Sequence, residues 1–105
     1  MVSHNGVAIV TGAGTGIGKS AALALLKDGY RVGLVGRRKE LLDKTAQDAG
    51  PAAANTLVLP ADVGNPESVK ALFASLQQAW GRLDVLFNNA GMGAPAIPLE
   101  DLSFE

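Results

Sequence analysis

An apolar run that enters a glycine-rich turn, followed by a helix-forming segment, most constrains what this sequence can fold into. Residues 7–10 are all apolar, and glycine then occupies positions 12, 14, 16 and 18. A strand, a turn and a helix in that order leave backbone N–H groups unpaired at the helix start, where the helix dipole favours an anion. Glycine lets the backbone approach a bound group closely. The pattern therefore predicts a phosphate-binding turn.

The same strand-and-helix unit occurs three times along the chain, and a fourth strand follows the third unit. Apolar runs predict strands at residues 6–11, 31–35, 56–59 and 83–87. Apolar periodicity predicts helices at residues 16–27, 38–49 and 66–80. Strands separated by helices pair in parallel through right-handed crossovers, with helices on both faces of the sheet. The expected fold class is α/β, a doubly wound parallel sheet.

The helix at residues 66–80 carries the clearest signals. Asn65 is a suitable N-cap, Pro66 fits the first turn, and Glu67 suits the positive end of the helix dipole. Its apolar face is expected to comprise Val69, Leu72, Phe73, Leu76 and Trp80. The helix at residues 16–27 is expected to face the sheet with Ile17, Ala21, Leu25 and either Ala24 or Leu26.

Composition excludes several classes of function. The chain has 105 residues, a net charge of −1 and no cysteine, so we expect one domain without disulfides, thiol chemistry or cysteine-held metals. Without a basic excess, neither nucleic acid nor an anionic membrane surface is expected as a partner. The apolar runs are too short for a membrane span, and no signal peptide is evident, so a cytoplasmic protein is expected. His4 has no ligand partner nearby, and no metal site is predicted.

The unusual residues of the chain lie where the predicted strands end. Beyond the glycine turn, they are Gly36-Arg37-Arg38, Ala61-Asp62-Val63 and Asn88-Asn89-Ala90-Gly91. In a doubly wound sheet, ligands bind beyond the carboxyl ends of the strands, at the point where the strand order reverses. This clustering predicts a nucleotide-binding crevice at that edge.

On these residues the chain resembles the short-chain dehydrogenase/reductase family. The resemblance runs from about residue 6 to residue 98 and rests on three motifs in order: Thr11-Gly12-x-x-x-Gly16-x-Gly18, Asp62-Val63 and Asn88-Asn89-Ala90-Gly91. It implies a Rossmann-like arrangement in which this chain supplies about four strands and three helices of a larger three-layer α/β/α sandwich. It also implies a nicotinamide dinucleotide as cofactor.

The resemblance assigns cofactor contacts to particular positions. It implies that five residues contact the pyrophosphate and the adjoining ribose: Gly12, Thr15, Gly16, Ile17 and Gly18. Asp62 would accept a hydrogen bond from the adenine amino group, and the backbone of Val63 would support the ring. Asn89, Ala90 and Gly91 would pass beside the adenosine ribose toward the nicotinamide. Asn88 is expected to tie strands together instead of touching the cofactor.

Charge after the second strand indicates which dinucleotide is bound. Members that bind NAD usually place an acidic residue there for the ribose 2′-hydroxyl, whereas this chain has Gly36 followed by Arg37 and Arg38. A guanidinium pairs with a 2′-phosphate in bidentate fashion. We therefore expect NADP(H), with Arg37 as the principal contact and Arg38 as a second one. NAD(H) stays the alternative, because the glycine turn carries Thr15 where many NADP-binding relatives have a basic residue.

The resemblance also implies a catalytic tyrosine, a lysine four residues later and an upstream serine, all beyond the fourth strand. The only tyrosine here is Tyr30, and Leu34 stands four residues after it, so no catalytic residue is predicted. Residues 1–105 are interpreted as a partial NAD(P)-binding Rossmann domain, truncated before the Tyr-x-x-x-Lys region. Five carboxylates scattered over the predicted helices and loops are expected to be solvated charges: Asp43, Asp48, Glu67, Glu100 and Asp101.

The expected function is that of an oxidoreductase passing hydride between a nicotinamide and a carbonyl or alcohol substrate. This chain would supply the cofactor-binding half and would be inactive alone. The alternatives are a nucleotide-binding module without catalysis and an inactive fragment. A homo-oligomer is expected at full length, and the sequence does not identify the substrate.

Overall fold

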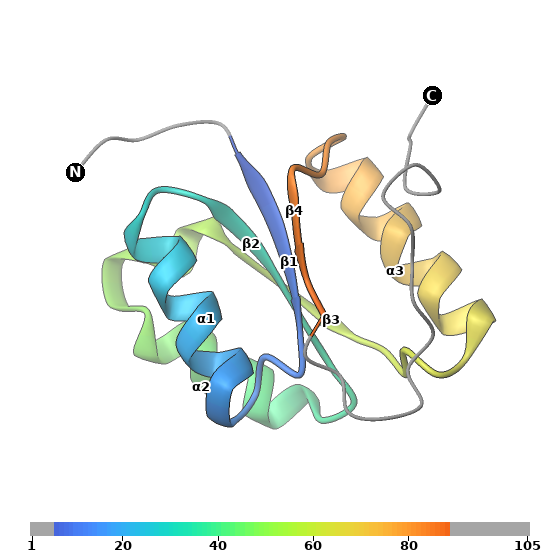
Figure 1. Cartoon of the computed structure of the whole chain (residues 1–105), viewed down its shortest axis with the longest axis horizontal. Coiled ribbons are helices and arrows are strands. Elements are labelled where there is room, and N and C mark those ends of the chain that lie inside the picture. Colours follow the sequence, from blue (N-terminus) through green and yellow to red (C-terminus); the bar gives the residue numbers. More distant parts are fainter. Residues whose placement is uncertain (1–5, 89–105) are drawn as a thin grey trace.

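The computed structural model describes residues 6–88, and within them strands and helices alternate as the sequence predicts (Figure 1). The elements in chain order are β1 (Val7–Thr11), α1 (Gly16–Lys27), β2 (Arg31–Gly36), α2 (Lys39–Asp48), the 3-10 helix η1 (Gly50–Asn55), β3 (Thr56–Pro60), α3 (Pro66–Ala79) and β4 (Val85–Phe87). The bounds differ from the predicted ones by at most two residues. The Ala-rich segment before β3 is a 3-10 helix.

The strands form one parallel sheet in the order β3-β2-β1-β4. The chain steps outward from β1 to β3 and then returns to place β4 on the other side of β1, so the strand order reverses beside β1. Figure 1 shows α1 and α2 on one side of the sheet and α3 on the other. The predicted doubly wound α/β fold is therefore confirmed.

Two buried clusters, one on each face of the sheet, form the core. Ala8, Val10, Val32 and Leu34 pack toward α1 and α2. The alternate strand residues pack toward α3, in a cluster that contains Val7, Ile9, Val35, Leu59, Leu72 and Leu76. Since both faces are covered, β1 and β2 must be apolar at consecutive positions, which explains the continuous runs in the sequence.

The sheet-facing side of α1 differs from the expected one. Gly18, Ala22 and Leu26 are its buried residues, whereas Ile17 is a large apolar side chain that is 70% exposed. Ala21 and Leu25 are half-buried at the margin of the cluster. The expectation was wrong for Ile17 and is confirmed for Leu26, the alternative to Ala24, whereas the buried Gly18 and Ala22 were not expected. This helix lies against β1 and β2 through small residues, which permit a close approach.

The predicted cap of α3 is confirmed. The side-chain oxygen of Asn65 accepts hydrogen bonds from the backbone N–H groups of Glu67, at 2.9 Å, and Ser68, at 3.4 Å. Leu72 and Leu76 of the predicted apolar face are buried, and Phe73 and Trp80 pack against the same cluster. Capping and apolar spacing thus agree on where this helix begins and which side faces the sheet.

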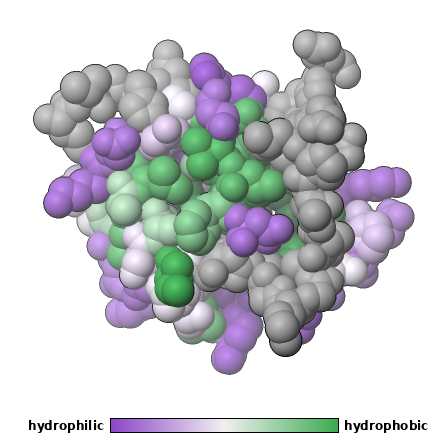
Figure 2. Space-filling model, in the orientation of Figure 1, coloured by the Kyte–Doolittle hydropathy of each residue, from purple (hydrophilic) through white to green (hydrophobic). Residues whose placement is uncertain are grey.

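Within residues 6–88, β4 is bonded to β1 alone and forms one edge of the sheet. Its residues Val85, Leu86 and Phe87 are half-buried, and Figure 2 shows hydrophobic side chains gathered over this edge, between the helices of the two faces. None of the described helices is both long enough and apolar enough to cross a membrane.

Candidate functional site at the carboxyl ends of the strands

The glycine turn leads from the end of β1 into the first turn of α1. Gly12 and Gly16 have positive φ values of 64° and 57°, which L side chains rarely adopt. Thr15, the N-cap residue of α1, has an extended backbone and makes no side-chain hydrogen bond to the helix. A side chain at position 16 would meet nothing within 4 Å. The start of α1 is therefore open and without a side-chain cap, a geometry that suits an anion.

A small hollow of about 120 Å³ joins this turn to the end of β2. Its lining residues are Gly12, Gly14, Thr15, Gly36, Arg37, Arg38, Leu41 and Leu42. They come from the turn, from the segment after β2 and from the first turns of α2. The fold thus brings together residues that the sequence predicted separately, with two arginine residues and an open helix start in one lining. A phosphate-bearing ligand fits this set of donors and charges.

Each of the two arginines stands near a carboxylate. Arg37 Nη2 lies 3.6 Å from Asp62 Oδ1, and the two side chains are 79% and 48% exposed. Arg38 Nε donates to Glu40 Oε1 at 2.9 Å. The pKa of Glu40 is lowered, first by its hydrogen bond to the backbone and then by Arg38. Exposed ion pairs of this kind contribute little to stability, so both arginines remain able to turn toward a ligand anion.

Asp62 is held by the loop between β3 and α3. Its Oδ1 accepts from the backbone N–H of Gly64 at 2.9 Å, and its own backbone N–H donates to Ser68 Oγ at 2.9 Å. Val63, which follows it, is half-buried against the α3 cluster. Sequence reasoning did not assign a role to Ser68. Its position in the first turn of a helix with a predicted N-cap was a sequence signal that could have indicated this contact.

The ends of β1 and β4 are tied by polar side chains. Thr11 Oγ1 lies 3.1 Å from Asn88 Oδ1, to which it donates. This contact confirms the expectation that Asn88 links strands. Of the remaining predicted site residues, Gly18 is buried in α1 and Ile17 is exposed beside the turn. Asn89, Ala90 and Gly91 lie outside the described residues, as does His4.

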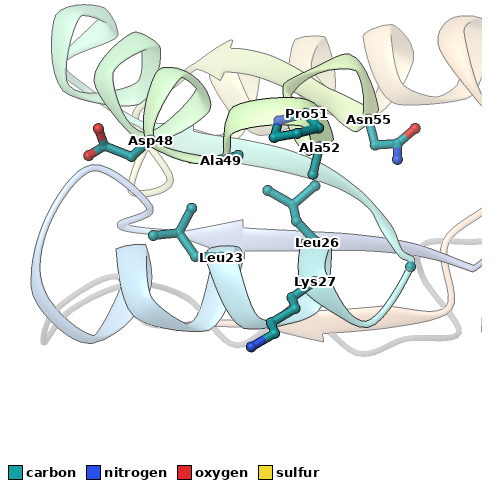
Figure 3. Close-up of a pocket in the computed structure, with 9 residues that line it drawn as sticks. Leu23, Leu26, Lys27, Asp48, Ala49, Pro51, Ala52 and Asn55 are labelled. Carbon is teal, nitrogen blue, oxygen red and sulfur yellow. The ribbon is translucent and has the colours of Figure 1, made fainter. Parts of the chain in front are cut away.

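At the other end of the sheet, where the strands begin, α1 and the α2–η1 segment enclose a larger pocket of about 500 Å³. Figure 3 shows Leu23 and Leu26 of α1 pointing toward Ala49 and Ala52, which lie at the end of α2 and in η1. Tyr30 lies at this same end, immediately before β2, and packs against the core. Neither feature belongs to the candidate site. Among residues 6–88, no group of three or more His, Cys, Asp or Glu residues is placed to hold a metal ion.

Comparison with known proteins finds a matching family model and curated relatives. The family model described as short chain dehydrogenase matches residues 6–105. A curated relative, the 3beta-hydroxysteroid dehydrogenase of Mediterraneibacter gnavus, is 38% identical over 96 residues, which are 91% of this chain and 35% of the relative. This chain therefore spans about a third of the length of that relative.

The solved structures that match this chain include two reductases. The actinorhodin polyketide ketoreductase, solved with NADPH, matches with a TM-score of 0.79 and 36% identity, over 86% of this chain and 35% of that one. The 3-ketoacyl-(acyl-carrier-protein) reductase of Brucella melitensis, solved with NADH, matches with a TM-score of 0.70 and 32% identity, over 77% and 32%. Of these two proteins similar to this chain, one is thus solved with NADPH and the other with NADH.

Proposed function

The chain belongs to the short chain dehydrogenase family, and on this basis we propose that it binds a nicotinamide dinucleotide at the carboxyl ends of its strands. The observation that carries the proposal is the hollow in which Gly12 and Thr15 of the turn meet Arg37 and Arg38. When bound, the dinucleotide would supply hydride chemistry. The residues of this chain bind and orient it.

The proposed contacts follow the order of the strands. The turn and the open start of α1 hold the pyrophosphate and adjoining ribose through the group Gly12, Thr15, Gly16, Ile17 and Gly18. Asp62 accepts from the adenine amino group, and the Val63 backbone supports the ring. The segment Asn89, Ala90 and Gly91 runs beside the ribose toward the nicotinamide. No catalytic residue is assigned to this chain.

NADP(H) is the proposed dinucleotide, with NAD(H) as the alternative. Arg37 and Arg38 stand after β2, where a carboxylate would repel a 2′-phosphate and a guanidinium attracts it. Both side chains are more than two-thirds exposed, at 79% and 69%. They can therefore leave Asp62 and Glu40 for a bound phosphate at little cost.

At the level of the whole protein, we propose an oxidoreductase that transfers hydride between the nicotinamide and a carbonyl or alcohol substrate. Residues 1–105 supply the cofactor-binding part, a partial Rossmann domain without the Tyr-x-x-x-Lys region. A cytoplasmic homo-oligomer is the form proposed for the full-length protein. A nucleotide-binding module without catalysis is the second candidate, favoured by the placement of Tyr30 at the edge away from the site.

The substitution Arg37→Asp tests the choice of dinucleotide. It removes a charge-assisted contact to the 2′-phosphate and adds a second carboxylate beside Asp62, so NADPH affinity is expected to fall by about ten-fold or more. NADH affinity should be unchanged or improved. Fluorescence titration of the chain with each dinucleotide measures both constants.

Lys70→Asp is the matched control, since it makes the same charge change on an exposed position of α3. Its NADPH affinity should stay close to that of the wild type. An Arg37→Asp variant that keeps full NADPH affinity would show that the 2′-phosphate is not held at this position.

A further inference from the structure

Thr45 of α2 is a buried polar residue whose hydroxyl reaches the glycine turn. It is 0% exposed, and its Oγ1 donates to the carbonyl oxygen of Ala13 at 2.9 Å. A second acceptor, the carbonyl of Leu41 one turn earlier in α2, lies at 3.2 Å. A helical threonine can satisfy its hydroxyl within its own helix. The shorter contact is nevertheless the one that crosses 32 residues of chain to the turn.

Ala13 is thereby held from both sides. Its backbone N–H donates to the carbonyl of Val35 in β2 at 3.1 Å, and its carbonyl accepts from Thr45. The residue is itself 0% exposed. It lies between Gly12 and Gly16, whose positive φ values of 64° and 57° set the path of the turn. The Ala13 peptide is therefore the fixed point of an otherwise glycine-rich segment.

The same face of α2 presses against the turn at a second place. A Cβ at Gly14 would stand 2.7 Å from the Cβ of Leu41, a separation that side chains do not tolerate. Leu41 and Thr45 are four residues apart and therefore lie on one side of the helix. Leu41 also lines the hollow together with Gly14 and Thr15. Thus α2 touches the turn and the hollow with a single face.

The geometry points to Thr45 as a positioning residue for dinucleotide binding, an inference that rests on the proposed function. Thr45 lies outside the residues that line the hollow and acts through the Ala13 carbonyl, which it holds so that the turn keeps its binding conformation. A glycine-rich turn has more conformational freedom to lose than other segments. A turn fixed before the ligand arrives avoids that loss on binding.

Removal of the Thr45 hydroxyl tests this role. Thr45→Val keeps the shape of the side chain but leaves the buried Ala13 carbonyl without its donor, and we expect about ten-fold weaker binding of the preferred dinucleotide. Thr45→Ala, a second variant without the hydroxyl, should weaken binding in the same direction. Thr45→Ser keeps the hydroxyl and should restore affinity to near the wild-type value. NADPH and NADH are the titrants.

Thr56→Val is the matched control. Thr56 Oγ1 donates to the carbonyl of Ala53 at 2.7 Å, a bond of the same chemical kind at the η1–β3 junction, on the edge away from the turn. It should lower thermal stability without changing dinucleotide affinity. If Thr56→Val weakens binding as much as Thr45→Val, or if Thr45→Ser fails to rescue it, the loss is one of general stability and the inference is wrong.

Hydrogen exchange in the ligand-free chain separates this inference from the proposed function. The amides of residues 13–16 should exchange about ten-fold faster in Thr45→Val than in the wild type or in Thr45→Ser, with those of η1 unchanged. If the wild type binds the dinucleotide and Thr45→Val changes neither amide exchange nor affinity, the inference about Thr45 is wrong, whereas the proposed function still stands. A wild-type chain that binds neither NADPH nor NADH overturns the proposed function.

Discussion

Three glycines of the turn between β1 and α1 are required for two different physical reasons. Gly12 and Gly16 have positive φ, at 64° and 57°, so their backbone conformation is the constraint. Gly14 is not among the glycines with positive φ. A side chain is excluded there because its Cβ would clash with the Cβ of Leu41 in α2. Phosphate approach is therefore not the only reason for a glycine-rich turn here, because the packing of a helix also requires one.

Gly14→Ala is expected to lower the free energy of unfolding by about 1–3 kcal/mol, the usual range for overpacking a tight contact. The new methyl group would stand 2.7 Å from the Leu41 Cβ, and neither atom can rotate away from the other. The turn or α2 must therefore shift. Urea denaturation followed by circular dichroism measures the loss.

Gly64→Ala is the comparison for this substitution, since the nearest atom there is the Asp62 carboxylate oxygen at 3.3 Å. The end of a side chain can give way by a few tenths of an ångström, so the destabilisation should be clearly smaller. Equal stability of Gly14→Ala and the wild type would mean that α2 does not press on the turn.

At the scale of elements, α2 connects the candidate site to the core. Leu42 and Thr45 are its buried residues, and its first turns carry Leu41 and Leu42 into the lining of the hollow. Asp48 at its last turn forms an ion pair with Lys19 of α1, both about one-third exposed. The helix is thus attached to the turn at one end and to α1 at the other.

The Asp48–Lys19 pair is expected to make the free energy of unfolding depend on pH. The hydrogen bond from Lys19 lowers the pKa of Asp48 below its usual 3.8. A lowered folded-state pKa contributes stability above the unfolded value, and that contribution is lost as the pH falls through the folded value. Asp48→Asn should therefore be less stable than the wild type at pH 7, and the difference should shrink as the pH falls from about 3.8 toward the lower folded-state pKa. Thermal melts across this range measure it.

Asp43→Asn is the control for the pH experiment. Asp43 pairs with Lys39 within α2, at 2.8 Å and with both side chains more exposed than those of the Asp48 pair. This pair lies within one helix and does not link two, so its loss is expected to lower stability at pH 7 by less. A difference between Asp48→Asn and the wild type that is as large at pH 3 as at pH 7 would rule out the ion pair as the cause.

At the scale of the whole molecule, the edge formed by the carboxyl ends of the strands differs chemically from the edge formed by their amino ends. The carboxyl edge holds the turn, the arginines and Asp62, whereas the amino edge holds Tyr30 and the apolar pocket beside η1. The six residues of β2 separate Tyr30 from Arg37, a distance of roughly 20 Å at the rise of a strand. A proton donor at Tyr30 cannot reach a ligand bound at the carboxyl edge.

The 105-residue chain is therefore expected to show no carbonyl reductase turnover above a buffer control when it is supplied with NADPH and simple ketones or aldehydes. NADPH oxidation followed by absorbance is the measurement. Turnover that persists in a Tyr30→Phe variant would reveal a catalytic group that neither the sequence nor the described residues indicate. Binding without turnover is the result that both proposed functions of this chain share.

The order and type of the elements could be predicted because the apolar patterns are local. The run at residues 7–10 and the cap at Asn65 each specify an element without help from distant residues, and both predictions are confirmed. The clustering of site residues at one edge followed from parallel pairing alone. The family resemblance implied that Asn88 ties strands together, and its contact with Thr11 at the end of β1 confirms this.

The inward face of α1 and the contacts of the site required the tertiary structure. The apolar pattern of α1 favoured Ile17 as a buried residue, but Gly18 and Ala22 are buried with Leu26 instead. The role of Thr45 depends on a partner 32 residues away, which no local pattern encodes. The sequence by itself determined the elements, their order and the end of the sheet at which the candidate site residues lie, because periodicity and chain direction are local properties. Only the tertiary structure decided which side chains meet there, because distances between separate elements are set by packing.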